Sequence, residues 1–322
     1  MTFAGSPDRV EAQLVPERGY AFDAFRIAGF PRRPGPALLR SLALAGAAPA
    51  ACLRILARRR PDVVLGGGGY VAGPMVLAAW LRRIPAALTE ADAHLGLANR
   101  LAAPFARRVF LAYPVPGFNG KARVVGRPVP ANLRSVSQAE ARTMFELPSE
   151  GRVVLVAGGS QGARTLNDTA VDTWGTAGPP VLHLSGTRDY EDLRPRVARA
   201  DYRLFPFVED FGAALAAADL VVSRAGGTVW EVAAAGRPAI LVPYPHATGD
   251  HQRRNAEYFA AAGGALIVDD AEARTRVPEL VAELLADEVR LRAMSDAMRA
   301  AAKPDAAERI ADELVALATA RR

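Results

Sequence analysis

An acidic residue, Glu231, follows a glycine pair in the segment RAGGTVWEVAAAGRPAILVPYP, which occupies residues 224–245. The pattern predicts a glycine loop, a helix that begins near Thr228, and a buried strand. A carboxylate in the first turn of a helix is favoured by the helix dipole, so helix capping is one interpretation. A phosphate-binding loop would not hold an anion beside its ligand, whereas a carboxylate readily accepts hydrogen bonds from a ribose diol. We therefore expect Glu231 to bind sugar hydroxyls, with capping as the alternative.

Two other glycine loops could present backbone amides to a ligand. GGSQGAR, at residues 158–164, predicts a helix start where Ser160 caps and Gln161 offers both a donor and an acceptor; helix N-termini attract phosphates. GGGGY, at residues 66–70, lacks the Gly-Lys-Ser/Thr that a P-loop needs. That loop either lets a polar substrate approach the backbone or is only a tight turn. We expect the phosphates of a ligand at GGSQGAR.

A polar helix start in HATGDHQRRNAEYF, residues 246–259, adds one more candidate group. Asp250 is expected to cap this helix, and Gln252 lies in its first turn, where an amide can reach a sugar hydroxyl. A solvated helix start without a ligand is the alternative.

Short apolar runs alternate with helical segments throughout the chain, which predicts parallel sheets built from βαβ units. The pattern restarts after VVGRPVPANLRSVSQAEA, residues 124–141, where Pro128 and Pro130 interrupt the periodicity. We therefore expect two Rossmann-like domains, at residues 1–127 and 128–322, with the last helix packing back toward the first domain. Open α/β sheets bind ligands at the carboxyl ends of their strands, so a cleft between two such domains would hold the substrates.

Composition excludes several classes of protein. The 322 residues include a single cysteine, Cys52, and four histidines without metal-ligand spacing, so neither disulfides nor a metal is expected. No apolar run reaches the length of a membrane span. The net charge of +6 favours anionic partners, but the arginines lack the interleaved aromatic residues of a nucleic-acid surface, so no nucleic acid is expected as a partner.

Taken together, several segments resemble the MurG family of bacterial cell-wall synthesis. They are VLGGGGYVAGPMVLAAW, LTEADAHLGLANRLAA, GGSQGARTLN, LFPFVEDFGAALAAADLVVSRAGGTVWEVAAAGRPAILVPYPHATGDHQRRNA and KPDAAERIADEL. The resemblance extends over nearly the whole chain in order. It implies an α/β protein of the GT-B glycosyltransferase fold, with UDP-GlcNAc as donor and lipid I, an undecaprenyl-linked muramoyl pentapeptide, as acceptor. The implied reaction is inverting transfer of GlcNAc to the muramoyl 4-hydroxyl in peptidoglycan synthesis, without a cofactor.

The resemblance also implies roles for individual residues. Ser160 would lie at the donor diphosphate, the Val208 backbone at the uracil, Glu231 at the ribose, and Gln252 at the GlcNAc hydroxyls. The full donor set is Ser160, Gln161, Val208, Gly226, Gly227, Thr228, Val229, Trp230, Glu231 and Gln252. The acceptor and cleft set is Gly67, Gly68, Gly69, Tyr70, Glu90 and Asp92.

The chain departs from the family pattern in four places, and the first of these bears on catalysis. The family opens with a strand, a G-T-G-G-H loop and a helix, and this chain begins at the segment that follows that helix. The loop histidine, which the family pattern gives as the general base, is therefore absent, and the catalytic base is unknown. A truncated start is our preferred interpretation, and the N-terminal sheet should then be interrupted at a central position. The segment TEAD, residues 89–92, stands where the family often has His-Glu-Gln-Asn, a family arginine falls on Pro130, and the RAGGT loop is one residue shorter.

The basic and leucine-rich segment 26–60 predicts contact with an anionic membrane surface, with an ordinary core helix as the alternative. The expected location is the cytoplasmic face of the bacterial plasma membrane, as a peripheral protein. Other possible functions are a different GT-B UDP-sugar transferase, a UDP-GlcNAc 2-epimerase, and a catalytically impaired fragment or inactive scaffold that lacks the first glycine loop.

Overall fold

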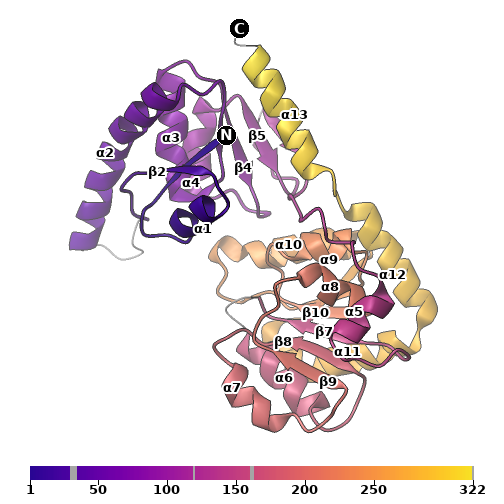
Figure 1. The fold of residues 1–322 in the computed structure, drawn as a ribbon. Coiled ribbons are helices and arrows are strands. Elements are labelled where there is room, and N and C mark those ends of the chain that lie inside the picture. Colours follow the sequence, from indigo (N-terminus) through magenta and orange to yellow (C-terminus); the bar gives the residue numbers. More distant parts are fainter. Residues whose placement is uncertain (30–34, 119, 160–162, 321–322) are drawn as a thin grey trace. The chain divides into compact units, whose positions relative to one another are not determined.

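The computed structural model describes residues 1–29, 35–118, 120–159 and 163–320 of the chain (Figure 1). It divides into two compact units. Unit 1 contains Met1–Ala91, Leu95–Val125 and Glu308–Arg322, and unit 2 contains Asp92–His94 and Gly126–Ala307. Each unit is an α/β structure with parallel strands, as the alternating pattern predicts.

The described strands of unit 1 form two parallel sheets. One sheet pairs β1 (Thr2–Gly5) with β2 (Ala21–Ala24). The other has the order β3 (Val64–Gly66), β4 (Ala86–Glu90), β5 (Arg108–Leu111) and β6 (Ala122–Val124). The helical segments of this unit are α1 (Glu11–Glu17), α2 (Pro36–Arg59), α3 (Gly69–Leu81), α4 (Leu97–Ala102), the 3₁₀ turn η1 (Ala103–Phe105), and α13 (Ala306–Thr319), of which residues from Glu308 onward belong to unit 1.

The core of unit 1 lies between the four-stranded sheet and two long helices. Cys52 and Leu56 from α2 and Val76 from α3 pack with Leu88 and Val109 from the sheet. On α13, Ile310 and Leu317 join a second cluster with Ala87 and Phe110. The inner face of α2 is therefore a core face, which was the alternative interpretation of this segment.

Unit 2 has a six-stranded parallel sheet in the order β12-β11-β10-β7-β8-β9. Helices cover both faces of this sheet (Figure 1), with α6 and α11 packed in one large apolar cluster. The strands are β7 (Val154–Ala157), β8 (Val181–Leu184), β9 (Tyr202–Phe205), β10 (Leu220–Ser223), β11 (Ala239–Leu241) and β12 (Ala265–Ile267). The helical segments are α5 (Gln138–Met144), α6 (Arg164–Trp174), α7 (Tyr190–Leu193), η2 (Arg194–Arg196), α8 (Phe211–Ala217), α9 (Val229–Ala234), η3 (Thr248–Asp250), α10 (His251–Ala261), η4 (Asp270–Glu272), α11 (Ala273–Ala286) and α12 (Glu288–Ala301).

The strand order of unit 2 reverses between β7 and β10. From β7 the chain proceeds through β8 to the edge strand β9, and from β10 it proceeds through β11 to the opposite edge strand β12. The carboxyl ends of β7 and β10 therefore form a topological switch point, the usual ligand position in an open α/β sheet. In the described part of the chain, no helix combines the length and the apolar character needed to cross a bilayer.

Candidate functional site at the switch point of unit 2

Two of the three glycine loops begin side by side at this switch point. Ala157, the last residue of β7, is the register partner of Ser223, the last residue of β10. Gly158 and Gly159 of the GGSQGAR segment follow β7, and the loop at residues 224–228 follows β10. The ends of β7 and β10 therefore lie side by side, and it stays a prediction that the two loops share one ligand site. Ser160 and Gln161 themselves lie outside the described residues.

Asp270 links the loop at residues 224–228 to the helix α6. Arg224, the first residue of the 224–228 loop, places its Nη1 2.5 Å from Asp270 Oδ1 and also donates to the carbonyl of Val242 at 3.1 Å. The hydroxyl of Thr165, in the first turn of α6, donates to Asp270 Oδ2 at 3.1 Å. One carboxylate therefore fixes the start of the loop after β10 relative to the start of α6.

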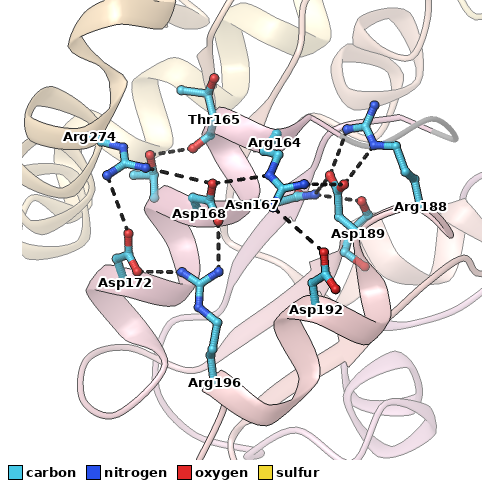
Figure 2. Close-up of polar contacts among 12 residues, drawn as sticks. Arg164, Thr165, Asn167, Asp168, Asp172, Arg188, Asp189, Asp192, Arg196 and Arg274 are labelled. Atoms are coloured by element: carbon cyan, nitrogen blue, oxygen red, sulfur yellow. Dashed lines mark hydrogen bonds and ion pairs between the residues drawn. The ribbon is translucent and has the colours of Figure 1, made fainter.

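A network of ion pairs braces the same helix from its other side (Figure 2). Arg196 binds Asp168 at 2.9 Å and Asp172 at 2.6 Å, both on α6. The buried Asp189 accepts a hydrogen bond from Asn167 at 2.9 Å, and the adjoining Arg188 guanidinium holds the pKa of Asp189 below its usual range. The exposed pairs contribute little each, whereas the buried link between Asn167 and Asp189 ties α6 to the segment after β8.

The glycine pair is packed against a cation. A Cβ atom added to Gly227 would collide with the guanidinium of Arg127, so no larger residue fits without displacing that group. A Cβ atom added to Gly226 would be 3.9 Å from Nε2 of Gln252. The structure thus brings together Gly226, Gly227 and Gln252 from the predicted donor set, and adds Arg127.

Two members of that set have side chains in the core. Val229 and Trp230 are buried in the first turn of α9, and the Trp230 ring lies 5.7 Å from Tyr258 and 5.2 Å from Phe259 between centroids. Only their backbone groups can face a ligand. Thr228, which precedes α9, is half-buried.

Glu231 differs from these neighbours, because its half-buried carboxylate accepts no hydrogen bond from any described residue. Burial raises the pKa of Glu231, and the charge of Arg127 opposes that rise. An acceptor held near a cation and left without an internal partner suits a hydroxyl-bearing ligand. This geometry favours the ligand interpretation over the capping one.

Two amide side chains of α10, those of Gln252 and Asn255, lie near the glycine pair and differ in how they are bonded within the described part of the chain. Gln252 accepts a hydrogen bond from the Tyr244 N–H at 2.9 Å, which fixes its side chain and leaves its NH₂ group as the part able to meet a hydroxyl. Asn255 is fully buried and donates to the Ala225 carbonyl at 3.1 Å and to Asp92 at 3.1 Å. Asp92, expected with Glu90 at the acceptor, therefore lies against α10 within unit 2.

The predicted cap of α10 by Asp250 is wrong. Asp250 adopts a left-handed conformation with φ of 52°, and its side chain makes no capping hydrogen bond. The chain instead enters α10 through the 3₁₀ turn η3, in which the Asp250 N–H donates to the Ala247 carbonyl.

The predicted uracil contact, Val208, is half-buried and lies three residues after the edge strand β9. Strands β7 and β8 separate β9 from β10.

The acceptor candidates of unit 1 follow β3 and β4. Gly67 and Gly69 have open space at the Cβ position, while Gly68 approaches the Thr89 carbonyl. The hydroxyl of Tyr70 accepts a hydrogen bond from Arg9 Nε at 2.9 Å. The Glu90 carboxylate accepts from the N–H groups of Ala91 and Gly96, both at 3.0 Å, and from Asn99 Nδ2 at 2.9 Å, so it holds the loop after β4 together.

Sequence reasoning missed Arg127, Asp270 and Asn255. The position of Asn255 could have been inferred from the sequence, because it lies three residues after Gln252 and so on the same face of α10. The position of Asp270 could also have been inferred, since it follows the last strand of the sheet at the carboxyl edge. Nothing in the sequence indicated Arg127, because only the folding of residues 126–127 onto α9 places it beside Gly227. In the described residues no group of three His, Cys, Asp or Glu side chains could hold a metal.

The chain matches two family models, described as the glycosyltransferase family 28 N-terminal domain at residues 2–111 and the glycosyltransferase family 28 C-terminal domain at residues 153–310. A curated relative from Halothermothrix orenii is 35% identical, with 94% of this chain and 87% of the relative covered. One from Mycobacterium bovis is 42% identical, with 99% and 82% covered. Both are named UDP-N-acetylglucosamine–N-acetylmuramyl-(pentapeptide) pyrophosphoryl-undecaprenol N-acetylglucosamine transferase.

One solved structure is a member of the same family, and another shares only the fold. Acinetobacter baumannii MurG has a TM-score of 0.77 at 29% identity, covering 97% of this chain and 90% of that protein. A UDP-GlcNAc 2-epimerase from Neisseria meningitidis has a TM-score of 0.65 at 15% identity, which shows a shared fold only. The match to both family models and to these relatives over nearly the whole chain shows the family, and the order of the strands agrees with it: the chain belongs to the MurG family of GT-B glycosyltransferases.

Proposed function

We propose that this protein transfers N-acetylglucosamine from UDP-GlcNAc to the muramoyl 4-hydroxyl of undecaprenyl-diphospho-MurNAc-pentapeptide, with inversion at the anomeric carbon. The names of the relatives supply the donor and the acceptor. The observation that carries the proposal for this chain is the pairing of two glycine loops at the switch point of unit 2, beside Glu231.

In this proposal unit 2 binds the donor. The loop that contains Ser160 and Gln161 and the start of α6 meet the diphosphate, where backbone amides and the helix dipole stabilise the leaving UDP. Glu231 accepts hydrogen bonds from the ribose hydroxyls, the Gln252 amide donates to the GlcNAc, and the backbone at Val208 meets the uracil. Gly226, Gly227 and Thr228, with the backbone of Val229 and Trp230, form the wall that lies against the nucleoside.

Unit 1 binds the acceptor in the same proposal. The open backbone at Gly67 and Gly69 allows the lipid diphosphate to approach, with Gly68 and Tyr70 completing that loop. Glu90 acts by shaping the neighbouring loop, since its oxygens already accept hydrogen bonds from that loop. The membrane partner is an anionic surface at the cytoplasmic face, where the lipid acceptor resides.

Two exposed apolar side chains in unit 1 support that membrane contact. Trp80 and Leu81, at the end of α3, are 52% and 53% exposed, and Arg82 and Arg83 follow them at once. Tryptophan beside basic residues is typical of protein surfaces that sit at the lipid headgroups.

The donor assignment is tested with Glu231→Ala and a matched helix variant. We expect the dissociation constant for UDP-GlcNAc, measured by titration calorimetry, to rise about tenfold to a hundredfold, because a hydrogen bond to a charged group is worth about 1.5–3 kcal/mol. Binding is measured rather than turnover, so the result does not depend on the acceptor.

Glu140→Ala is the control, since Glu140 occupies the same position in the first turn of α5 and is engaged only in a capping box with Ser137. That variant should lose stability and keep its donor affinity. If Glu231→Ala behaved in the same way, with lower stability and unchanged affinity, Glu231 would be only a cap. Release of UDP in the presence of lipid I, and not in its absence, tests the transfer itself.

A further inference from the structure

Three arginines meet at a pocket of unit 2 on the edge of the sheet opposite the glycine loops. The pocket has a volume of about 290 Å³ and is lined by Arg134, Arg237 and Arg299, with Ala216 and Ala235. Helices α8 and α9 precede β10 and β11, so both helices end at the amino edge of the parallel sheet, and these two alanines mark their ends. The donor site lies at the carboxyl edge.

The arginines use only part of their hydrogen-bonding capacity within the protein. Arg134 directs Nε and Nη2 to the Ala234 carbonyl, and Arg237 donates through Nη2 to the Ala216 carbonyl at 3.0 Å. Arg299 donates through Nη2 to Asp296 at 2.9 Å. Each guanidinium has five N–H donors. Among the described residues, the buried Nε of Arg237 has no hydrogen-bond partner.

Positive charge around Arg237 is only partly compensated. Burial lowers the pKa of Arg237, the neighbouring Arg299 and Arg142 lower it further, and Asp219 opposes them. Asp219 is itself bound to Arg142 at 2.8 Å and to the Val153 N–H at 2.7 Å. With Asp296, which is 75% exposed, two carboxylates face four guanidiniums. An anion in the pocket would remove this imbalance.

Capping of the helix ends accounts for only part of this arrangement. Arginines often donate to the last carbonyls of a helix, which explains Arg134 and the Nη2 of Arg237. It does not explain the unpaired Nε of Arg237. Nor does it explain Arg299, whose Nη1 would lie 2.5 Å from a Cβ atom added to Gly236 and which donates to neither helix end.

We propose that this pocket is a second anion site, which binds the phosphate group of a small ligand or of a lipid headgroup. Guanidinium forks match the geometry of phosphate oxygens, and three converging forks suit a multiply charged anion. The volume lies at the lower limit for small-molecule sites, so the pocket fits one phosphate group with a short attachment. Arg237 forms the floor, and the exposed Arg134 and Arg299 form the rim.

The test is a titration of the full chain with inorganic phosphate at constant ionic strength, with saturating UDP present to occupy the donor site. NMR of the arginine Nε–H groups is the readout. We expect a saturable shift of the Arg237 Nε–H resonance, and about tenfold weaker binding in the double variant Arg134→Ala, Arg299→Ala. The floor residue Arg237 is kept, because its replacement could prevent folding.

The double variant Arg276→Ala, Arg292→Ala is the matched control, since it removes two exposed arginines from the adjoining helices α11 and α12. It should bind phosphate like the wild type. Equal phosphate affinity in the wild type and in both double variants would overturn the proposal, as would an Arg237 resonance that does not respond. Competition by phosphatidylglycerol vesicles, compared with phosphatidylcholine vesicles, distinguishes a headgroup from a soluble phosphate.

Discussion

The charge of Arg127 acts on the Glu231 carboxyl group without a direct ion pair among the described contacts, and the ionisation of Glu231 should be visible in donor binding. Burial favours the neutral acid and raises the pKa of Glu231, whereas the Arg127 charge favours the carboxylate. Only the carboxylate can accept hydrogen bonds with both oxygens from a ribose diol. Because the pKa lies above its usual value, protonation should weaken donor binding as the pH falls toward the mildly acidic range.

We predict that Arg127→Ala shifts the acidic limb of UDP-GlcNAc affinity to higher pH. Without the opposing cation, burial acts alone and the pKa of Glu231 rises further. The measurement is the dissociation constant for UDP-GlcNAc between pH 5 and pH 8 in the wild type, Arg127→Ala and Arg127→Lys. In the lysine variant, the pH at which affinity falls should return most of the way to the wild-type value.

Two further variants separate this effect from a general loss of charge. Glu231→Gln should abolish the acidic limb, because the amide does not titrate in this range. Arg253→Ala removes an arginine from α10 and should leave the limb where it is. An acidic limb at the same pH in Arg127→Ala and in the wild type would refute the coupling of these two side chains.

The adjacent residues Trp230 and Glu231 show how far a sequence determines single side chains. Both were predicted for the donor site from one motif, yet the Trp230 ring packs in the core, whereas the Glu231 carboxylate accepts no hydrogen bond from the residues that the structure describes. Periodicity places residues on a helix, but α9 has only six residues, too few for a pattern to distinguish its faces. Asp250 failed as a cap for a similar local reason, because its backbone is left-handed.

At the scale of elements, the alternation of apolar runs with helical segments was enough to predict parallel βαβ units, but the short strands β1 and β2 were not predicted. Helix α3 begins at Gly69, inside the segment GGGGY that was expected to be a loop, although glycines and Pro74 lower the helix propensity of its first turns. Its packing against α2 and the core outweighs that propensity. The segment GGGGY is thus partly the start of a helix.

For α2, the sequence could not distinguish a core helix from a helix that contacts the membrane, because both have the same amphipathic pattern.

At this scale we predict that the end of α3 contributes to membrane binding. The double variant Trp80→Ser, Leu81→Ser should bind vesicles that contain anionic phospholipid several-fold more weakly in a flotation assay, because it removes exposed apolar area beside Arg82 and Arg83. Val289→Ser is the control, since Val289 is 80% exposed and lies in unit 2. Equal flotation of the double variant and the wild type would exclude this surface.

At the scale of the whole chain, the restart of the βαβ pattern was enough to predict two α/β units, and the position of the ligands at the carboxyl edge of each sheet stays a prediction. The order of the strands was not readable, because pairing between distant segments leaves no local signal. That order places the loops after β7 and β10 together. The contacts made by Asp270, Asn255 and Arg127 depend on it, which is why they emerged only from the structure.

The core of unit 2 also holds a histidine that should control stability against acid. His183 is fully buried on β8, hydrogen-bonded to Tyr202 at 2.8 Å and Asn167 at 3.0 Å, and burial lowers its pKa from 6.5 to about 3. The unfolded chain takes up a proton below pH 6.5 that the folded chain does not. The stability of unit 2 should therefore be full above about pH 6.5 and fall as the pH decreases toward 3. Asp189, with its lowered pKa, loses its contribution only below 3.8.

We predict that the free energy of unfolding of unit 2 decreases between pH 6.5 and pH 4.5, with a slope that approaches about 1.4 kcal/mol per pH unit for this one group. Urea unfolding is followed by tryptophan fluorescence in a Trp80→Phe background, where the two remaining tryptophans, Trp174 and Trp230, both report on unit 2. His183→Gln should flatten this dependence, whereas replacement of the exposed His246 by glutamine should leave it unchanged. The same slope in His183→Gln and in the wild type would show that the buried imidazole does not set the acid sensitivity of this unit.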